Sequence, residues 1–340
     1  MRTFLSLLLF LGLWAAPPAA GFHTLKALPI GGAGGWDYVT LDASARRLYV
    51  PRSDRVLVLD LEGKSVGLIP GTDGVHGVAL APGLDRGYTS NGRSNTITIF
   101  KLSTLEVLAQ VKATGEGPDA ILFEPFTNRV FSFNGRGQNA TVIDARKGEV
   151  VGTIPFGHKP EFAATDNQGH VFVNLEDSAE VAVIDAQKLT IEKKWPLAPI
   201  VDPTGMAIDL KHHRLFIVGG NKLMAVVDAK TGKLLATAAI GAGADAAAYD
   251  AELGLAFSSN GEGTLTVVRQ DGPDQYAVLE EIPTKRGART MALDPTTHRI
   301  YLPAAEYGSA PAAATAATKE TPRPRPAMLP DSFRLLVVGR

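Results

Sequence analysis

Side chains that bind charged ligands recur in this sequence at intervals of about 42 residues. Carboxylates that face one another repel, so they attract a cation or retain a proton. A histidine among them adds a nitrogen ligand for a divalent metal, and an arginine favours a carboxylate or phosphate. The set therefore suits a metal ion or a small amphoteric ligand. Its members are Asp37, His76, Asp119, Glu161, Thr204, Asp245 and Arg289.

Two neighbouring residues extend this candidate site. Trp36 precedes Asp37, where the other units have valine, proline or alanine. It would either stack on a ligand or fill space under its loop. Arg286, three positions before Arg289, adds a second guanidinium. The predicted ligand-binding residues are Trp36, Asp37, His76, Asp119, Glu161, Asp245, Arg286 and Arg289, and the candidate metal ligands are Asp37, Asp119, Glu161 and Asp245.

A structural role for the acidic residues is the alternative. Acidic side chains in turns often accept hydrogen bonds from nearby backbone N–H groups and stay solvated. No group of metal ligands is close enough in sequence to define a site, and no serine nucleophile has a recognisable motif. The sequence therefore predicts no catalytic residue and leaves a divalent metal as an open alternative.

Only a circular repeat would bring together residues that lie up to about 250 positions apart. Each unit contains four short β-type runs, which in the first unit are 38–41, 47–50, 56–59 and 64–69. Runs of this length with polar or glycine-containing breaks favour antiparallel hairpins. An arginine follows the first turn at a constant offset in several units, as in Asp42 to Arg47 and Glu124 to Arg129. Seven such units predict an all-β fold, a seven-bladed β-propeller.

The two ends of the repeat complement each other. Residues 287–340 contain only three predicted strands, and Thr24–Leu28 has the pattern of a fourth strand without a unit of its own. We expect this N-terminal strand to complete the last blade and close the ring. Residues 309–330 are rich in alanine and proline and interrupt the last unit. That composition predicts a flexible insertion in blade seven.

The N-terminus and the composition limit where the protein acts. Residues 1–21 contain one basic residue, an apolar run and then small residues, which predicts a secretory signal peptide followed by one domain over 22–340. The chain has no cysteine, which excludes a lipidated cysteine. We therefore expect a periplasmic or extracellular protein that is not a lipoprotein and has no membrane span after signal cleavage. The formal net charge of -1 gives no basic surface for nucleic acid.

Several runs carry a family resemblance. Arg47-Leu48-Tyr49-Val50 and residues 129–134, RVFSFN, look like the YVTN repeat, and the whole chain after residue 21 resembles YncE-like seven-bladed propellers. The resemblance implies an exported bacterial protein of a family regarded as binding modules. Two units depart from the pattern. In unit four a histidine, His170, replaces the arginine one position early, and in unit six Leu255 replaces it.

These observations lead to two functional hypotheses. The first is a non-catalytic binding or scaffold propeller of the cell envelope, monomeric, that holds a small molecule or an envelope protein at the polar mouth of its channel. The second is a metal-dependent hydrolase of the propeller lactonase type, in which the carboxylate ring holds the ion that activates water. Metal content would distinguish them.

Overall fold

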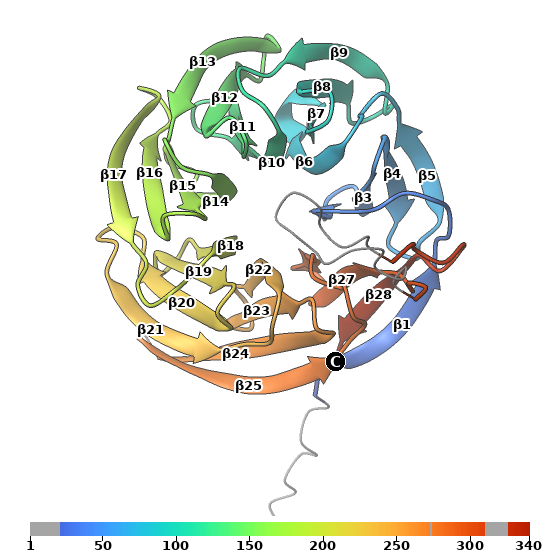
Figure 1. Cartoon of the computed structure of the whole chain (residues 1–340), viewed down its shortest axis with the longest axis vertical. Helices are drawn as coiled ribbons and strands as arrows, with labels where there is room; N and C mark the ends of the chain where they lie inside the picture. The colour runs from blue at the N-terminus through green and yellow to red at the C-terminus, as the bar shows by residue number, and fades with distance from the viewer. Residues whose placement is uncertain (1–20, 273, 310–325) are drawn as a thin grey trace, which may run out of the picture.

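Seven four-stranded antiparallel sheets surround a central axis in the computed structural model (Figure 1). The structure describes residues 21–272, 274–309 and 326–340. The predicted seven-bladed propeller is therefore confirmed. The predicted signal peptide lies outside the described residues except for Gly21, and so does most of the 309–330 insertion.

Each blade runs from an inner strand near the axis to an outer strand at the rim (Figure 1). Blade 1 contains β2 (Thr40–Asp42), β3 (Arg47–Arg52), β4 (Arg55–Asp60) and β5 (Ser65–Ile69); blade 2 contains β6 (Val75–Ala81), β7 (Arg86–Asn91), β8 (Thr96–Lys101) and β9 (Val107–Lys112); blade 3 contains β10 (Pro118–Glu124), β11 (Arg129–Asn134), β12 (Asn139–Asp144) and β13 (Glu149–Pro155). Blade 4 contains β14 (Pro160–Thr165), β15 (His170–Leu175), β16 (Glu180–Asp185) and β17 (Thr190–Pro196); blade 5 contains β18 (Pro203–Asp209), β19 (Arg214–Gly219), β20 (Leu223–Asp228) and β21 (Leu234–Ala239). Blade 6 contains β22 (Ala244–Asp250), β23 (Leu255–Asn260), β24 (Thr264–Gly272) and β25 (Gln275–Pro283); blade 7 contains β26 (Ala292–Asp294), β27 (Arg299–Ala304), β28 (Arg334–Gly339) and β1 (His23–Pro29). A short 3₁₀ turn, η1 (Pro82–Leu84), joins β6 to β7.

The turns of the repeat explain why the hairpins form where they do. Acidic residues at the end of inner strands bond the backbone of the following turn: Asp42 Oδ1 accepts from Ala45 N at 2.9 Å, and Asp250 Oδ1 accepts from Leu253 N at 3.0 Å. Asn91, which ends β7, donates through Nδ2 to Thr98 Oγ1 at 2.9 Å, and Asn260 bonds Thr266 in the same way. These recurring polar residues therefore stabilise the sheets themselves.

The opening strand of blade 1 is shorter than the prediction over 38–41. Its pairing with β3 begins at Thr40, opposite Tyr49. The carbonyl of Asp37 accepts a hydrogen bond from Thr290 Oγ1 at 2.9 Å. It therefore links blade 1 to blade 7 instead of pairing within the sheet of blade 1.

The two ends of the described chain share blade 7. β1 pairs with β28 in antiparallel register, with Thr24 opposite Val338 and Pro29 opposite Arg334. That this strand holds the ring closed remains a prediction, which a deletion tests. Among the described residues, no helix has the length and apolar character needed to cross a membrane.

Arginines at the start of second strands join neighbouring blades. Arg47 Nη1 donates to Leu102 O at 3.0 Å, and Arg86 Nη1 donates to Ala145 O at 3.1 Å. Arg129 reaches Ala186 O in the same manner. Each bond runs from one blade to the residue after the third strand of the next, so these arginines stabilise three blade interfaces.

The histidine of blade 4 occupies the same register position as these arginines. His170 pairs with Asp185, as Arg129 pairs with Asp144. The expectation that this histidine stands one position early is therefore wrong, because register depends on strand pairing and not on the length of the preceding turn.

Candidate functional site at the mouth of the channel

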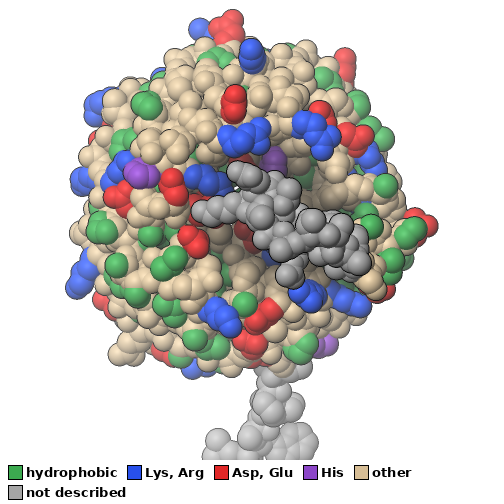
Figure 2. Space-filling model, viewed as in Figure 1, with side chains coloured by type: hydrophobic (Ala, Val, Ile, Leu, Met, Phe, Trp, Pro, Cys, Tyr) green, Lys and Arg blue, Asp and Glu red, His purple; other side chains and the backbone are tan. Residues whose placement is uncertain are grey.

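The inner strands place the recurring residues on one ring. His76, Asp119, Glu161 and Asp245 are each the second residue of an inner strand, namely β6, β10, β14 and β22. Because the blades are related by rotation about the axis, these equivalent positions converge at one end of the channel. Acidic and basic side chains and a histidine surround the centre of this face (Figure 2).

One side of the ring is a contact between an imidazole and two carboxylates. His76 Nδ1 lies 2.6 Å from Asp37 Oδ2 and 3.4 Å from Asp119 Oδ1. The three residues can each direct one ligand atom to a common point, since these atoms lie within 4.8 Å of one another. This is the group in the described chain that best fits a divalent metal.

Asp37 connects this group to the arginine of blade 7. Arg289 Nε lies 3.1 Å from Asp245 Oδ2, and Arg289 Nη2 lies 4.0 Å from Asp37 Oδ1. The Arg289 side chain is half exposed, at 50%, whereas both aspartates are 15% exposed. One face of its guanidinium therefore remains open to a ligand.

Glu161 lies deeper than the rest of the ring. Only 7% of its surface is exposed, and its Oε1 accepts a hydrogen bond of 2.9 Å from the Tyr38 hydroxyl. Lys159 Nζ lies 3.0 Å from Glu161 Oε2, off the hydrogen-bond direction, so this contact is ionic; the same ammonium bonds Glu176. Tyr38 comes from blade 1 and Glu161 from blade 4, so their bond crosses the channel.

The excess of carboxylates changes how the site titrates. Burial, with the charges of Glu161 and Asp37, raises the pKa of Asp119 to about 7, although His76 opposes the shift. Burial raises the pKa of Asp245 to about 7 as well, although Arg289 opposes it. Near neutral pH these two carboxyls are therefore partly protonated.

His76 and Tyr38 shift in response to the same negative field. Burial alone would lower the pKa of His76, but its hydrogen bond to Asp37 and the charge of Asp119 outweigh burial, and the pKa is raised. Burial first, and then the charges of Asp119 and Glu161, raise the pKa of the Tyr38 hydroxyl well above its ordinary value. Tyr38 is thus a neutral hydrogen-bond donor at every physiological pH.

The channel below the ring is narrow and mostly apolar. A cavity of about 60 Å³ lies there, lined among others by Tyr38, Val78, Ile121 and Met291. The Tyr38 ring meets the Phe162 ring edge-on, with centroids 5.2 Å apart. A charged ligand would therefore stay at the mouth, because the mostly apolar floor gives it few polar partners.

Two predicted residues lie apart from this cluster. Trp36 packs against Phe333, with ring centroids 5.2 Å apart, and against Tyr307 at 6.3 Å. Its ring therefore has neighbours of its own within blade 7. Arg286 is exposed and forms no ion pair with the other ring residues that the structure describes.

Several important residues of the mouth were not predicted from the sequence. Tyr38 and Lys159 determine the surroundings of Glu161, and Arg52 supports the loop before Asp37. Arg52 is fully buried, and its Nη2 donates to Gly32 O at 2.8 Å while its Nε donates to Gly34 O at 3.1 Å. One feature of the sequence could have identified Arg52: it occupies the repeat position at which other units have Asn91, Asn134 or Asn260.

Comparison with known proteins defines the class as a seven-bladed β-propeller. A structure titled Kuenenia stuttgartiensis hydrazine synthase is similar with a TM-score of 0.70 and 14% identity, over 85% of this chain and 96% of that one. A structure titled mitotic checkpoint complex is similar with a TM-score of 0.72 and 14% identity, over 88% and 95% of the two chains. At this identity the likeness concerns the fold alone. No protein-family model and no curated protein matches the sequence.

Proposed function

We propose that this protein is a non-catalytic binding propeller of the cell envelope, of the YncE-like type, that holds a small amphoteric ligand at the mouth of its channel. The main observation in support of this proposal is the imbalance of charge in the ring. Four carboxylates, Asp37, Asp119, Glu161 and Asp245, stand against two permanent cations, Arg289 and Lys159.

A ligand ammonium group would relieve this imbalance. His76 already lies between Asp37 and Asp119, so the ammonium would bind beside Asp119, add positive charge to the ring and displace the proton from Asp119. The exposed face of Arg289 would receive the carboxylate of the same ligand. The N-terminal sequence pattern supports export, and the absence of a nucleophile motif supports binding without catalysis.

Isothermal titration with amines, diamines and free amino acids tests this function. We expect a zwitterion to bind with greater affinity at pH 8 than at pH 6, because Asp119 and Asp245 lose their protons between these values. We also expect proton release, measured as a dependence of the binding heat on buffer ionisation enthalpy. Asp119→Asn should weaken binding by about 10-fold or more, since a charge-assisted hydrogen bond contributes about 1.5–3 kcal/mol.

A matched control is Asp73→Asn. Asp73 is an exposed aspartate in the loop before β6, where it pairs with Arg93 at 3.0 Å and not with a residue of the ring. Its loss should leave the affinity unchanged. Failure of every amine to bind, or equal effects of the two substitutions, would contradict the proposal.

The second candidate is a metal-dependent hydrolase of the propeller lactonase type, and the group Asp37, His76 and Asp119 favours it. Those three side chains would hold the ion, and a divalent ion there would activate a bound water. Elemental analysis before and after chelation, followed by lactone hydrolysis assays, distinguishes the two. A stoichiometric ion that is lost in His76→Ala, with activity that depends on it, would replace the binding proposal.

A further inference from the structure

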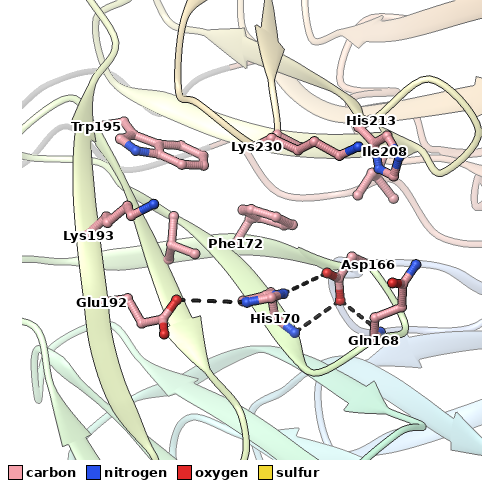
Figure 3. A pocket seen from close by; sticks show the side chains of 12 residues that line it. Asp166, Gln168, His170, Phe172, Glu192, Lys193, Trp195, Ile208, His213 and Lys230 are labelled. Carbon is pink, nitrogen blue, oxygen red and sulfur yellow. Dashed lines mark hydrogen bonds and ion pairs between the residues drawn. The ribbon is translucent and has the colours of Figure 1, made fainter.

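A second cavity lies between blades 4 and 5, away from the mouth. Its volume is about 280 Å³ (Figure 3). Asp166, on its wall, follows the end of β14, whereas Glu161 of the mouth is at the beginning of that strand. A strand of this length separates the two by about 15–20 Å, so the cavity is a site of its own.

The cavity exists where the arginine contact between blades is missing. At the preceding interface Arg129 reaches from blade 3 to Ala186 O of blade 4. At this interface the equivalent residues are His170 and Ala229, and both line the cavity. His170 turns back to its own blade, with Nδ1 at 2.8 Å from Asp166 Oδ2 and Nε2 at 3.8 Å from Glu192 Oε2. The space that an arginine side chain would fill at this interface is therefore left open.

One part of the cavity wall is aromatic and apolar. Phe172 and Trp195 are stacked, with ring centroids 6.0 Å apart and an interplanar angle of 27°. Ile208 of blade 5 contributes to the same lining. Gly232 of blade 5 approaches the indole so closely that a Cβ there would lie 2.2 Å from Trp195 Cγ. The indole is therefore held between Gly232 and Phe172. Trp195 is 8% exposed and Phe172 is 3% exposed, so these rings present their edges, which favour the face of an aromatic ligand.

The charges of the cavity favour an anion. In Figure 3 Glu192, His170 and Asp166 form a row along one side, and Trp195, Lys230 and His213 lie across from it. The two acidic side chains already face His170, as the dashed contacts show. Lys193 and Lys230 have no such contact with the other residues drawn. In the same view Lys230 extends toward His213, whereas Lys193 lies at the other end of the cavity beside Trp195. The ammonium group of Lys230, beside His213 and the apolar wall, attracts a carboxylate.

We propose that this inter-blade cavity binds a small planar aromatic carboxylate. The ring contacts the edges of Phe172 and Trp195, the carboxylate is bound by Lys230, and His170 hydrogen-bonds a polar substituent such as a hydroxyl group. Lys193, at the other end of the cavity, adds positive charge. The volume of about 280 Å³ is just below the usual range for ligand pockets, which selects compounds of one or two rings. The proposal does not depend on the function of the mouth.

Tryptophan fluorescence provides a direct assay. The chain has three tryptophans, Trp14, Trp36 and Trp195, so the variant Trp14→Phe/Trp36→Phe leaves Trp195 as the only one. We expect saturable quenching by 4-hydroxybenzoate, and calorimetry on the parent chain should give the same affinity. Indole-3-acetate is itself fluorescent, so its binding is measured by calorimetry alone. Cyclohexanecarboxylate, which has the charge without the planar ring, should bind at least about 10-fold more weakly.

The sharpest variant is His170→Arg, which restores the arginine of the repeat. The new side chain should fill the cavity and reach Ala229 O, so binding should be lost while the melting temperature is maintained or raised. Lys193→Gln/Lys230→Gln should weaken binding by about 10-fold or more, without depending on how His170→Arg folds. The control Lys211→Gln changes an exposed lysine of blade 5 outside the cavity and should bind as the parent does.

Two results would overturn the proposal. One is the absence of saturable binding of either aromatic acid at millimolar concentration. The other is unchanged affinity in both the folded His170→Arg variant and the double lysine variant. Asp119→Asn at the mouth should have no effect in this assay, so failure here and failure of the mouth proposal are distinguishable.

Discussion

The charge imbalance at the mouth makes a quantitative prediction about stability and pH. The pKa of Asp119 is raised from 3.8 to about 7 in the folded protein. The folded state therefore binds this proton more tightly than the unfolded state does. Its contribution to the free energy of unfolding is fully present below about pH 4 and is lost as the pH rises through about 7.

The size of the effect follows from the shift. A difference of about three pKa units at about 1.4 kcal/mol each amounts to about 4 kcal/mol by pH 8. The Asp119 side chain is 22% exposed, so little of this is lost to solvent screening. Asp119→Asn keeps the shape and removes the charge. We expect the variant to be about 2–4 kcal/mol more stable than the parent at pH 8 and equal to it near pH 4.

Urea and thermal melts of parent and variant between pH 4 and pH 8 measure this difference. The readout is the change in midpoint between the two proteins at each pH, because a repeat protein of this length need not unfold in two states. Asp73→Asn serves as the control and should match the parent throughout, since Asp73 is 48% exposed. An Asp119→Asn variant that is less stable at pH 8, or whose difference from the parent does not change with pH, would refute the reasoning.

Three further predictions concern the contacts that support the ring and the mouth. Deleting Phe22–Pro29 should lower the melting temperature of the whole domain, because β28 would lose its pairing partner β1; an unchanged melt would mean that this strand does not close the ring. Arg52→Ala should destabilise the protein by about 2–5 kcal/mol, because backbone carbonyls lose a buried donor and a cavity forms. In the same melts Arg55→Ala should have a small effect. Equal effects of the two substitutions would contradict the role of Arg52 in supporting the loop before Asp37. Tyr38→Phe should cost about 1–3 kcal/mol at pH 7, because buried Glu161 loses a hydrogen bond, and a neutral result would show that water replaces it.

The sequence predicted the repeat, the number of blades and the bounds of most strands. In blade 1 the second strand was expected over 47–50 and is Arg47–Arg52, and the third was expected over 56–59 and is Arg55–Asp60. These features are local, because an antiparallel hairpin is set by turn residues a few positions away. The predicted first residue of β2 was wrong, because the Asp37 carbonyl accepts a hydrogen bond from Thr290 of another blade.

The sequence predicted which positions lie at the mouth of the channel, but it did not predict the contacts among their side chains. Equal spacing in a circular repeat is enough to bring Asp37, His76 and Asp119 together. The spacing carries no information on side-chain direction or burial. It therefore did not predict that the Asp37 side chain contacts both His76 and Arg289, or that burial raises the pKa of Asp119.

Sequence alone thus determined the circular architecture and the candidate ring, since both follow from periodicity along the chain. Tertiary structure alone decided the contacts between blades. The bond from Tyr38 to Glu161 joins residues 123 positions apart, and the cavity beside His170 depends on a side chain that turns to its own blade instead of the next. Such contacts depend on how side chains of different blades pack against one another, which no pattern within a single unit specifies.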